Sequence, residues 1–220
     1  IYGLTHHDGI HHSIAQFYPE GTIVSTGLSK WCGAGGWRLG TFTLPDNLSP
    51  LLEAMAAIAS ETYTSVSAPV QFAAIKAYQG SPAIDQYLAD LRKVLQTVGQ
   101  FVYKQLQQMA IQLPPADGGF YLFPDFEKHR SKLKNKNIGN SLELCEKLLE
   151  ETGIALLPGL AFGRPPAELT ARLAFVDFDG EKILSALNEG KTRVESPDFL
   201  TDYCPNIHLA MQELRKWLEE

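Results

Sequence analysis

The chain has 220 residues, of which 45% are hydrophobic and 10% aromatic, and its formal net charge is −6. This composition is typical of a packed globular protein rather than a disordered one. The acidic balance argues against a nucleic-acid surface, which would need Lys and Arg gathered on one face. Cys32, Cys145 and Cys204 are far apart and form neither a disulfide framework nor a zinc motif, so we expect a reducing, cytoplasmic setting. No apolar run approaches the length of a membrane span.

The first predicted elements are short strands followed by helices. Residues 1–14 form a polar loop region that contains His6, His7, His11 and His12. The β-branched run over 22–25 and the segment over 37–44 predict two strands. Apolar residues at helical spacing then predict helices over 48–59 and 69–78.

The clearest predicted element is a long helix over 81–109. Pro82 follows Ser81 at its start, as is common for the first helical position. The apolar residues that recur every three or four positions are Ile84, Leu88, Leu91, Leu95, Val98, Val102, Leu106 and Met109. At 1.5 Å per residue such a helix would span roughly 40 Å. That length predicts a helix that joins two domains.

The remainder of the chain predicts a small alternating α/β unit. The lysine-rich patch over 128–136 is interpreted as a solvated loop, and 191–205 as a polar insert. Gly153 is expected to end a helix. The predicted elements, in order, are a strand over 119–124, a helix over 141–151, strands over 154–157 and 171–178, a helix over 180–188 and an amphipathic helix over 207–218.

The stretch TIVSTGLSKWCGAGGWRLGTF places Lys30 after the first predicted strand and Arg38 eight residues later. Lys30 precedes the glycines, which excludes a P-loop, and Arg38 occupies the third glycine position of a dinucleotide-binding motif. Either residue alone is more often an ordinary surface residue. Together they combine an amine that attacks aldehydes with a guanidinium that clamps an oxyanion. Pyridoxal phosphate, an aldehyde that carries a phosphate, needs both.

Ser29-Lys30 followed by GWRLG at 36–40 resembles the cofactor-lysine signature of class I/II aminotransferases, which are fold-type I pyridoxal-phosphate enzymes. Further stretches resemble other motifs of the family and occur in the same order. Tyr2 resembles the tyrosine of the family's Asp-x-x-Tyr strand, and SVSAPVQ at 65–71 resembles the segment that leads into its mid-chain helix. The last three are GGFYLFP at 118–124, similar to the first small-domain strand, PGLAFG at 158–163, similar to the PGxxFG turn, and ARLAF at 171–175, similar to the RLSFA strand. The resemblance covers roughly residues 1–190. It implies an α/β fold with the end of the large cofactor-binding domain over 1–80, an interdomain helix over 81–110 and a small C-terminal domain over 111–220.

The resemblance also implies a role for each matching residue. Lys30 would bind the aldehyde of pyridoxal 5′-phosphate covalently and move the proton of the substrate's α-carbon. Arg38, helped by Ser29, would hold the phosphate, and Tyr2 would hydrogen-bond the ring oxygen. Arg172 would bind the substrate α-carboxylate in a bidentate pair. No metal ion is expected, because the histidines of the first loop lack a spaced set of further ligands.

The chain departs from the family pattern in two respects. Gly27 stands where many members have a phosphate-binding serine, and Ser25 or Thr26 would have to compensate. The aspartate that pairs with the cofactor's ring nitrogen is expected upstream of Ile1, so the chain alone is expected to be inactive.

The implied reaction is transfer of an amino group between an amino acid and a 2-oxo acid. The enzyme would be a cytoplasmic homodimer of amino acid metabolism and biosynthesis, with no nucleic-acid or membrane partner. No Lys or Arg lies between Arg38 and Lys76, which favours a neutral or aromatic amino acid over aspartate. The alternatives are another reaction on the same scaffold, such as a C–S lyase, a decarboxylase or a synthase, and a non-catalytic fragment with the same fold.

Overall fold

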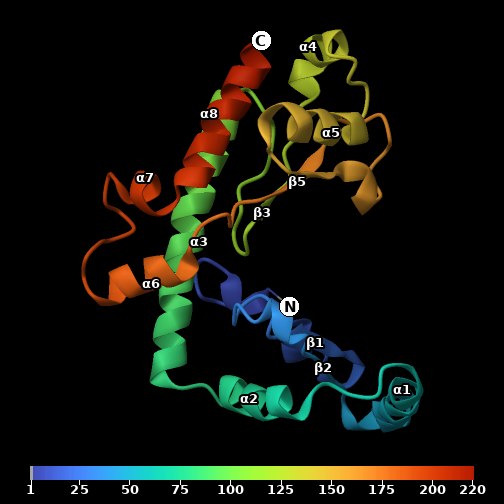
Figure 1. Cartoon of the computed structure of the whole chain (residues 1–220). Helices are drawn as coiled ribbons and strands as arrows, with labels where there is room; N and C mark the ends of the chain where they lie inside the picture. The colour runs from blue at the N-terminus through green and yellow to red at the C-terminus, as the bar shows by residue number, and fades with distance from the viewer. Residues whose placement is uncertain (1) are drawn as a thin grey trace. The chain divides into compact units, whose positions relative to one another are not determined.

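The computed structural model describes residues 2–220 and has the α/β character that the sequence predicts. The chain divides into two compact units, one up to Arg92 and one from Lys93 to Glu220. The division falls inside the longest helix, α3 (Pro82–Gln108), which lies within one residue of the predicted bounds at each end. Figure 1 labels the helices and strands, and each unit is described separately below.

The unit up to Arg92 contains one small sheet. Strands β1 (Val24–Gly27) and β2 (Gly40–Thr43) pair antiparallel, with Thr26 opposite Thr41 and Gly27 opposite Gly40. Its helices are α1 (Ser49–Thr62), α2 (Ala68–Gln79) and the first part of α3, and its short 3-10 turns are η1 (Gly3–Thr5), η2 (Ile14–Gln16), η3 (Pro19–Gly21), η4 (Gly35–Trp37) and η5 (Asp46–Leu48).

The prediction of a strand from residue 37 was wrong at its start. Gly35–Trp37 forms the 3-10 turn η4, and Arg38 follows it with a φ of 55°, in the left-handed region. A residue in that region cannot continue a strand, so β2 begins only at Gly40. The backbone between Lys30 and Arg38 is therefore a compact turn.

The hydrophobic core of this unit includes residues that flank that turn. Leu28, Trp31 and Leu39 are between 2% and 7% exposed and pack in one cluster with Ala74 of α2 and Leu88 of α3. The residues on both sides of Lys30 are thus held by the hydrophobic core, which fixes the path of the chain around the lysine.

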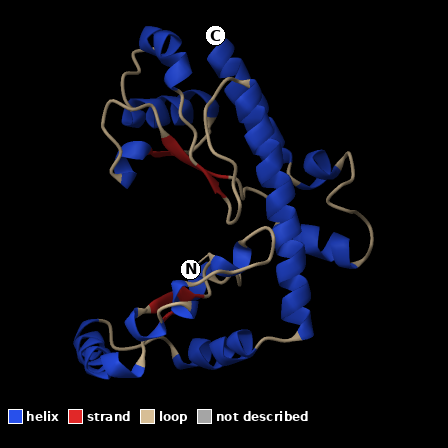
Figure 2. Cartoon of the chain, turned by 180° about the vertical axis from the view of Figure 1, so that it is seen from behind, coloured by secondary structure: helices blue, strands red, loops and turns tan. Residues whose placement is uncertain are grey.

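The unit from Lys93 onward contains a three-stranded antiparallel sheet in the order β3-β5-β4. Figure 2 shows the strands of both units in red. The sheet consists of β3 (Tyr121–Leu122), β4 (Leu157–Pro158) and β5 (Ala171–Ala174), and the other elements are η6 (Glu127–His129), α4 (Arg130–Asn135), α5 (Ser141–Thr152), η7 (Gly159–Phe162), α6 (Gly180–Asn188), α7 (Phe199–Tyr203) and α8 (Pro205–Glu219).

The core of the second unit lies between the helices and the sheet. The part of α3 from Lys93 lies beside α8: Arg215 of α8 donates a hydrogen bond of 3.1 Å to Oε1 of Gln105, and the rings of Phe101 and His208 stack with centroids 5.8 Å apart. The side chains that are fully buried include Val98, Val102, Leu106, Leu144, Leu148, Phe175, Ile183 and Leu214. The periodic apolar face predicted for α3 is therefore a packing face in this unit.

Two helices in this unit are absent from the sequence prediction. The lysine-rich patch forms α4 because Leu133, 1% exposed, anchors one face of it, while Lys132 donates a hydrogen bond to the carbonyl of Leu218. The polar insert contains α7, which buries Phe199 to 1% exposure. Each of these two short helices contains one buried apolar residue, which gives no periodic signal.

Within residues 2–220, no helix combines the length and the apolar character needed to cross a membrane.

Candidate active site

Three of the predicted cofactor residues line one pocket of about 310 Å³ in the first unit. They are Ser29, Lys30 and Arg38, and they are joined there by hydroxyl side chains from the paired strands. The full lining is Ser25, Thr26, Gly27, Ser29, Lys30, Arg38, Leu39, Gly40, Thr41 and Phe42. The turn after β1 and the start of β2 thus bring an amine, a guanidinium and several hydroxyl groups to one place.

Lys30 is held by the backbone turn that contains it. Leu28 donates its N–H to the carbonyl of Leu39 at 3.2 Å, and Ala34 donates to the carbonyl of Leu28 at 3.2 Å. The Lys30 side chain is half-buried, and its Nζ lies 5.6 Å from the centroid of the Tyr2 ring. The structure therefore brings the Tyr2 ring beside the lysine.

Arg38 is exposed, and its left-handed backbone is supported by a contact of its own side chain. Nη1 donates a hydrogen bond of 2.8 Å to the carbonyl of Gly35. A guanidinium has five N–H donors, so this bond leaves several for an anion. The chemistry of the lining suits a phosphorylated aldehyde, because it pairs one amine with a cation and neutral donors.

The replacement of the family's serine by Gly27 has a steric reason. Gly27 is buried and pairs with Gly40, and a Cβ added to it would lie 2.9 Å from the carbonyl oxygen of Leu39. Ser25, Thr26 and Thr41 line the same pocket and supply hydroxyl groups. Thr41 was missed by the sequence reasoning, which did not use the strand register that places it opposite Thr26.

Arg172 belongs to the second unit, on β5. Its side chain is half-buried, and its Cζ lies 4.4 Å from the centroid of the Tyr121 ring and 4.7 Å from that of Phe162. The arginine ion pairs that the described residues form, Arg130 with Glu127 and Arg164 with Glu168, do not involve it. Arg172 therefore places a positive charge beside two aromatic rings.

The histidine-rich first loop shows no metal-site geometry. Within residues 2–220, no three His, Cys, Asp or Glu side chains are grouped so that they could hold a metal ion. His6, His11 and His12 are exposed.

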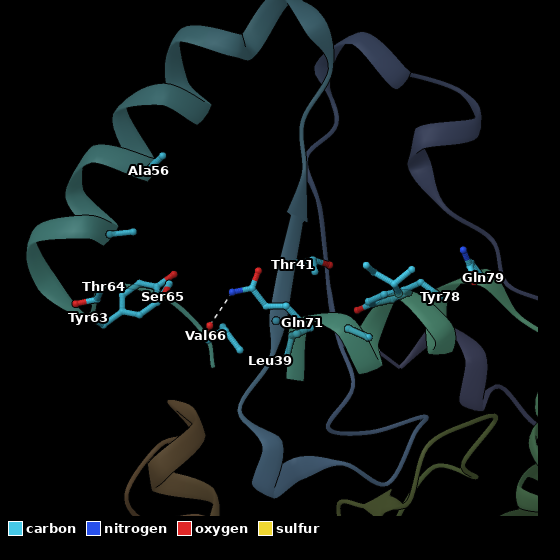
Figure 3. A pocket seen from close by; sticks show the side chains of 14 residues that line it. Leu39, Thr41, Ala56, Tyr63, Thr64, Ser65, Val66, Gln71, Tyr78 and Gln79 are labelled. Carbon is cyan, nitrogen blue, oxygen red and sulfur yellow. Dashed lines mark hydrogen bonds between the residues drawn. The ribbon is translucent and has the colours of Figure 1, made fainter. Parts of the chain in front are cut away.

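A larger pocket of about 740 Å³ lies between α1, α2 and β2 and was not predicted (Figure 3). Gln71 Nε2 donates a hydrogen bond of 2.6 Å to the carbonyl of Val66 within it. The pocket shares Leu39, Gly40 and Thr41 with the Lys30 pocket, and no charged residue belongs to its described lining.

The family model for aminotransferase class I and II matches residues 3–183 of the chain. The chain therefore belongs to the class I and II aminotransferases, a family whose enzymes depend on pyridoxal phosphate. This confirms the family assignment made from the cofactor-lysine signature.

Individual relatives agree with the family assignment. The aspartate aminotransferase of Geobacillus stearothermophilus is 30% identical over 166 residues, which are 74% of this chain and 40% of that protein. The probable N-acetyl-LL-diaminopimelate aminotransferase of Bacillus subtilis is 30% identical over 196 residues, or 89% of this chain and 44% of that protein. The chain thus spans less than half the length of these relatives.

Solved structures show the same fold. The aromatic aminotransferase of Pyrococcus horikoshii OT3 matches with a TM-score of 0.73 at 25% identity, over 100% of this chain and 49% of that chain. The aspartate aminotransferase double mutant of Thermus thermophilus matches with a TM-score of 0.72 at 21% identity. The predicted fold class, part of a fold-type I pyridoxal-phosphate enzyme, is confirmed.

Proposed function

We propose that this chain is the C-terminal part of an aminotransferase that moves an amino group between an amino acid and a 2-oxo acid. The observation that carries the proposal is the lining of the 310 Å³ pocket, where Lys30 and Arg38 meet several hydroxyl groups. An amine and an anion-binding guanidinium in one pocket match the aldehyde and the phosphate of pyridoxal 5′-phosphate.

The proposed roles divide the work between the cofactor and the chain. Pyridoxal phosphate supplies the electron sink that stabilises negative charge at the substrate's α-carbon. Lys30 Nζ would hold the cofactor at its aldehyde carbon. Once the substrate's amino group has displaced it there, the freed amine would carry the proton from the substrate's α-carbon to the cofactor. Arg38 and the hydroxyl of Ser29 hold the phosphate end, and Tyr2 donates a hydrogen bond to the ring oxygen.

In the second unit, Arg172 is proposed to bind the α-carboxylate that amino acids and 2-oxo acids share. A planar guanidinium forms two parallel hydrogen bonds to a carboxylate, which fixes the orientation of the bound acid. Because both substrates carry this group, one arginine would serve both halves of the reaction.

Several finer assignments belong to the same proposal. Residues 1–80 would end the large domain, 81–110 would form the interdomain helix and 111–220 the small domain. The enzyme would be a cytoplasmic homodimer in amino acid metabolism. A neutral or aromatic substrate is favoured, since no Lys or Arg lies between Arg38 and Lys76 to bind a second carboxylate.

The test is product analysis with the intact gene product that contains this chain, supplied with pyridoxal phosphate, an amino acid and a 2-oxo acid. We expect the new amino acid and the new 2-oxo acid in equal amounts. Lys30→Ala should abolish both, whereas Lys76→Ala, an exposed lysine in the last turn of α2, should not. Release of ammonia and pyruvate without a 2-oxo acid would indicate a lyase instead, and release of CO₂ a decarboxylase.

A further inference from the structure

The surroundings of Arg172 contain two aromatic rings that come from different sides of its strand. Tyr121 lies on β3, which pairs with one edge of β5, and Phe162 lies in η7, which follows β4 on the other edge. The Cζ of Arg172 is 4.4 Å from the first ring centroid and 4.7 Å from the second. Both distances are within the range of favourable cation–π contacts.

The sheet register explains the first of these contacts. Tyr121 is paired with Ala174 and Leu157 with Arg172, so Tyr121 is the diagonal neighbour of Arg172 on the same face of the sheet. Side chains two residues apart on a strand share a face. The antiparallel pairing of β3 with β5 therefore sets the Tyr121 ring beside the guanidinium.

The Phe162 ring is positioned by the turn that contains it. Gly159 donates its N–H to the carbonyl of Thr170 at 2.8 Å, and Gly163 ends the turn in the left-handed region with a φ of 75°. The Phe162 ring meets that of Phe123 edge-on, with centroids 5.9 Å apart and planes at 85°. Although Phe162 is 42% exposed, its position is fixed by these contacts.

Aromatic rings that contact a guanidinium restrict its motion, and N–H donors remain for a ligand. A guanidinium has five N–H donors, and a cation–π contact with an aromatic ring does not need all of them. A free arginine side chain loses considerable rotamer freedom when it binds a ligand, and a preorganised one loses less. Aromatic contacts that exist before the substrate binds therefore favour bidentate recognition of a carboxylate.

We propose that Tyr121 and Phe162 are positioning residues, which hold the Arg172 guanidinium ready for the substrate carboxylate. This inference rests on the proposed function, because it assigns the carboxylate to Arg172. The two rings act through the arginine and need not touch the substrate.

The experiment compares ring-removing with ring-conserving variants in the intact gene product. Tyr121→Leu and Phe162→Leu should raise the KM for the amino acid and for the 2-oxo acid in parallel, by roughly three- to tenfold each, with kcat little changed. Tyr121→Phe and Phe162→Tyr should stay near wild type. Leu160→Ala, in the same turn as Phe162 and 44% exposed, is the matched control and should also stay near wild type.

A second variant separates the electrostatic contact from packing. Pentafluorophenylalanine at position 162 keeps the shape of the ring but reverses the charge on its face, so it should raise both KM values as leucine does. Because it keeps the shape of the ring, this variant still allows KM to be measured if the leucine variants do not fold. A wild-type KM for pentafluorophenylalanine at 162 and for every variant at 121 that folds would overturn the inference.

Arg172→Gln distinguishes the inference from the function on which it rests. If it leaves both KM values unchanged, Arg172 does not bind the carboxylate and the proposed function loses that assignment. If it raises them while the ring variants do not, the carboxylate assignment stands and the positioning role is wrong.

Discussion

At the scale of single residues, Arg38 combines a backbone cost with a chemical role. It is a non-glycine residue with a φ of 55°, a conformation that costs roughly 1 kcal/mol for most side chains. Its guanidinium donates to the carbonyl of Gly35 and lines the Lys30 pocket. The strained backbone ends η4 and turns the chain into β2.

Replacing Arg38 by glycine separates the two effects. The Arg38→Gly change should alter the free energy of unfolding by no more than about 1 kcal/mol, because relief of backbone strain offsets the lost hydrogen bond. It should raise the Kd for pyridoxal phosphate about 10- to 100-fold, since a charge-assisted anion contact is lost. Equilibrium dialysis measures the second effect, and chemical denaturation the first.

Thr64→Gly is the matched control for Arg38→Gly. Thr64 also has a positive φ, of 70°, in the same unit, but it does not line the Lys30 pocket. Its replacement should leave cofactor affinity unchanged. Equal losses of affinity in the two variants would argue against a phosphate contact by Arg38.

The N-cap of α5 is a second residue-scale case. The Asn140 side chain accepts hydrogen bonds from the N–H groups of Leu142 and Glu143, both at 3.0 Å. Asn140→Ala should lower the free energy of unfolding by about 1 kcal/mol, whereas Asn140→Asp should keep most of the stability that the cap contributes. Denaturant titration of the three proteins checks this, and equal stability of the alanine variant would show that the cap is unimportant.

Glu151 adds a pH dependence to stability. The indole N–H of Trp217 donates to its Oε2 at 2.6 Å, and this hydrogen bond, with the charge of Lys147, lowers the pKa of the Glu151 carboxyl. Because the pKa of this carboxyl is lower in the folded than in the unfolded protein, the group adds stability at pH values above its unfolded-state pKa. This contribution is lost as the pH falls through its folded-state pKa.

Removing the Glu151 charge should therefore flatten the acid side of the stability curve. With an unfolded pKa near 4.3, the wild-type protein should lose stability relative to Glu151→Gln as the pH falls from about 5 to about 3. Trp217→Phe should flatten the curve in the same way, because it removes the hydrogen bond from the other side. Thermal unfolding across this range is the measurement, and parallel curves would contradict the assignment.

At the scale of elements, α3 depends on a glycine that its helical periodicity does not explain. Gly99 lies inside the helix, where glycine costs about 1 kcal/mol relative to alanine. A Cβ at this position would lie 2.9 Å from the Phe175 ring, which is fully buried. The glycine thus allows the segment after β5 to approach the helix.

Gly99→Ala should therefore destabilise the protein despite the better helix former. Overpacking of a buried site costs typically 1–3 kcal/mol, and about 1 kcal/mol of helix propensity is regained, so a net loss of about 1–2 kcal/mol is expected. Gly180→Ala, where an added Cβ meets nothing within 4 Å, is the control and should be neutral or slightly stabilising. A more stable Gly99→Ala variant would contradict this packing account.

The elements also show where prediction from sequence succeeded and where it did not. Helix α6 has the predicted bounds, and α5 ends at Thr152, directly before Gly153, whose φ of 74° suits a helix C-terminus. These helices have apolar periodicity and local caps, which the sequence displays. Strand β1 has the predicted length but begins two residues later, and the other four strands are shorter than predicted. Strand length depends on the partner strand, and β3 pairs over only two residues, Tyr121 and Leu122.

At the scale of the whole molecule, the candidate site was predictable where it rests on a local motif. Lys30, Ser29 and Arg38 lie within ten residues, and the turn that joins them follows from their glycines and from Trp31 in the core. Thr41, Tyr121 and Phe162 could not be found in this way. Their places depend on strand register and on contacts between segments distant in the sequence.

The most direct test of the central claim is the identity of the residue that binds pyridoxal phosphate. The intact gene product is mixed with the cofactor, reduced with borohydride and digested, and the modified peptide is sequenced by mass spectrometry. We predict one stable adduct, on Lys30, that disappears in Lys30→Ala and persists in Lys76→Ala. No adduct on Lys30, or an adduct spread evenly over exposed lysines, would contradict the assignment.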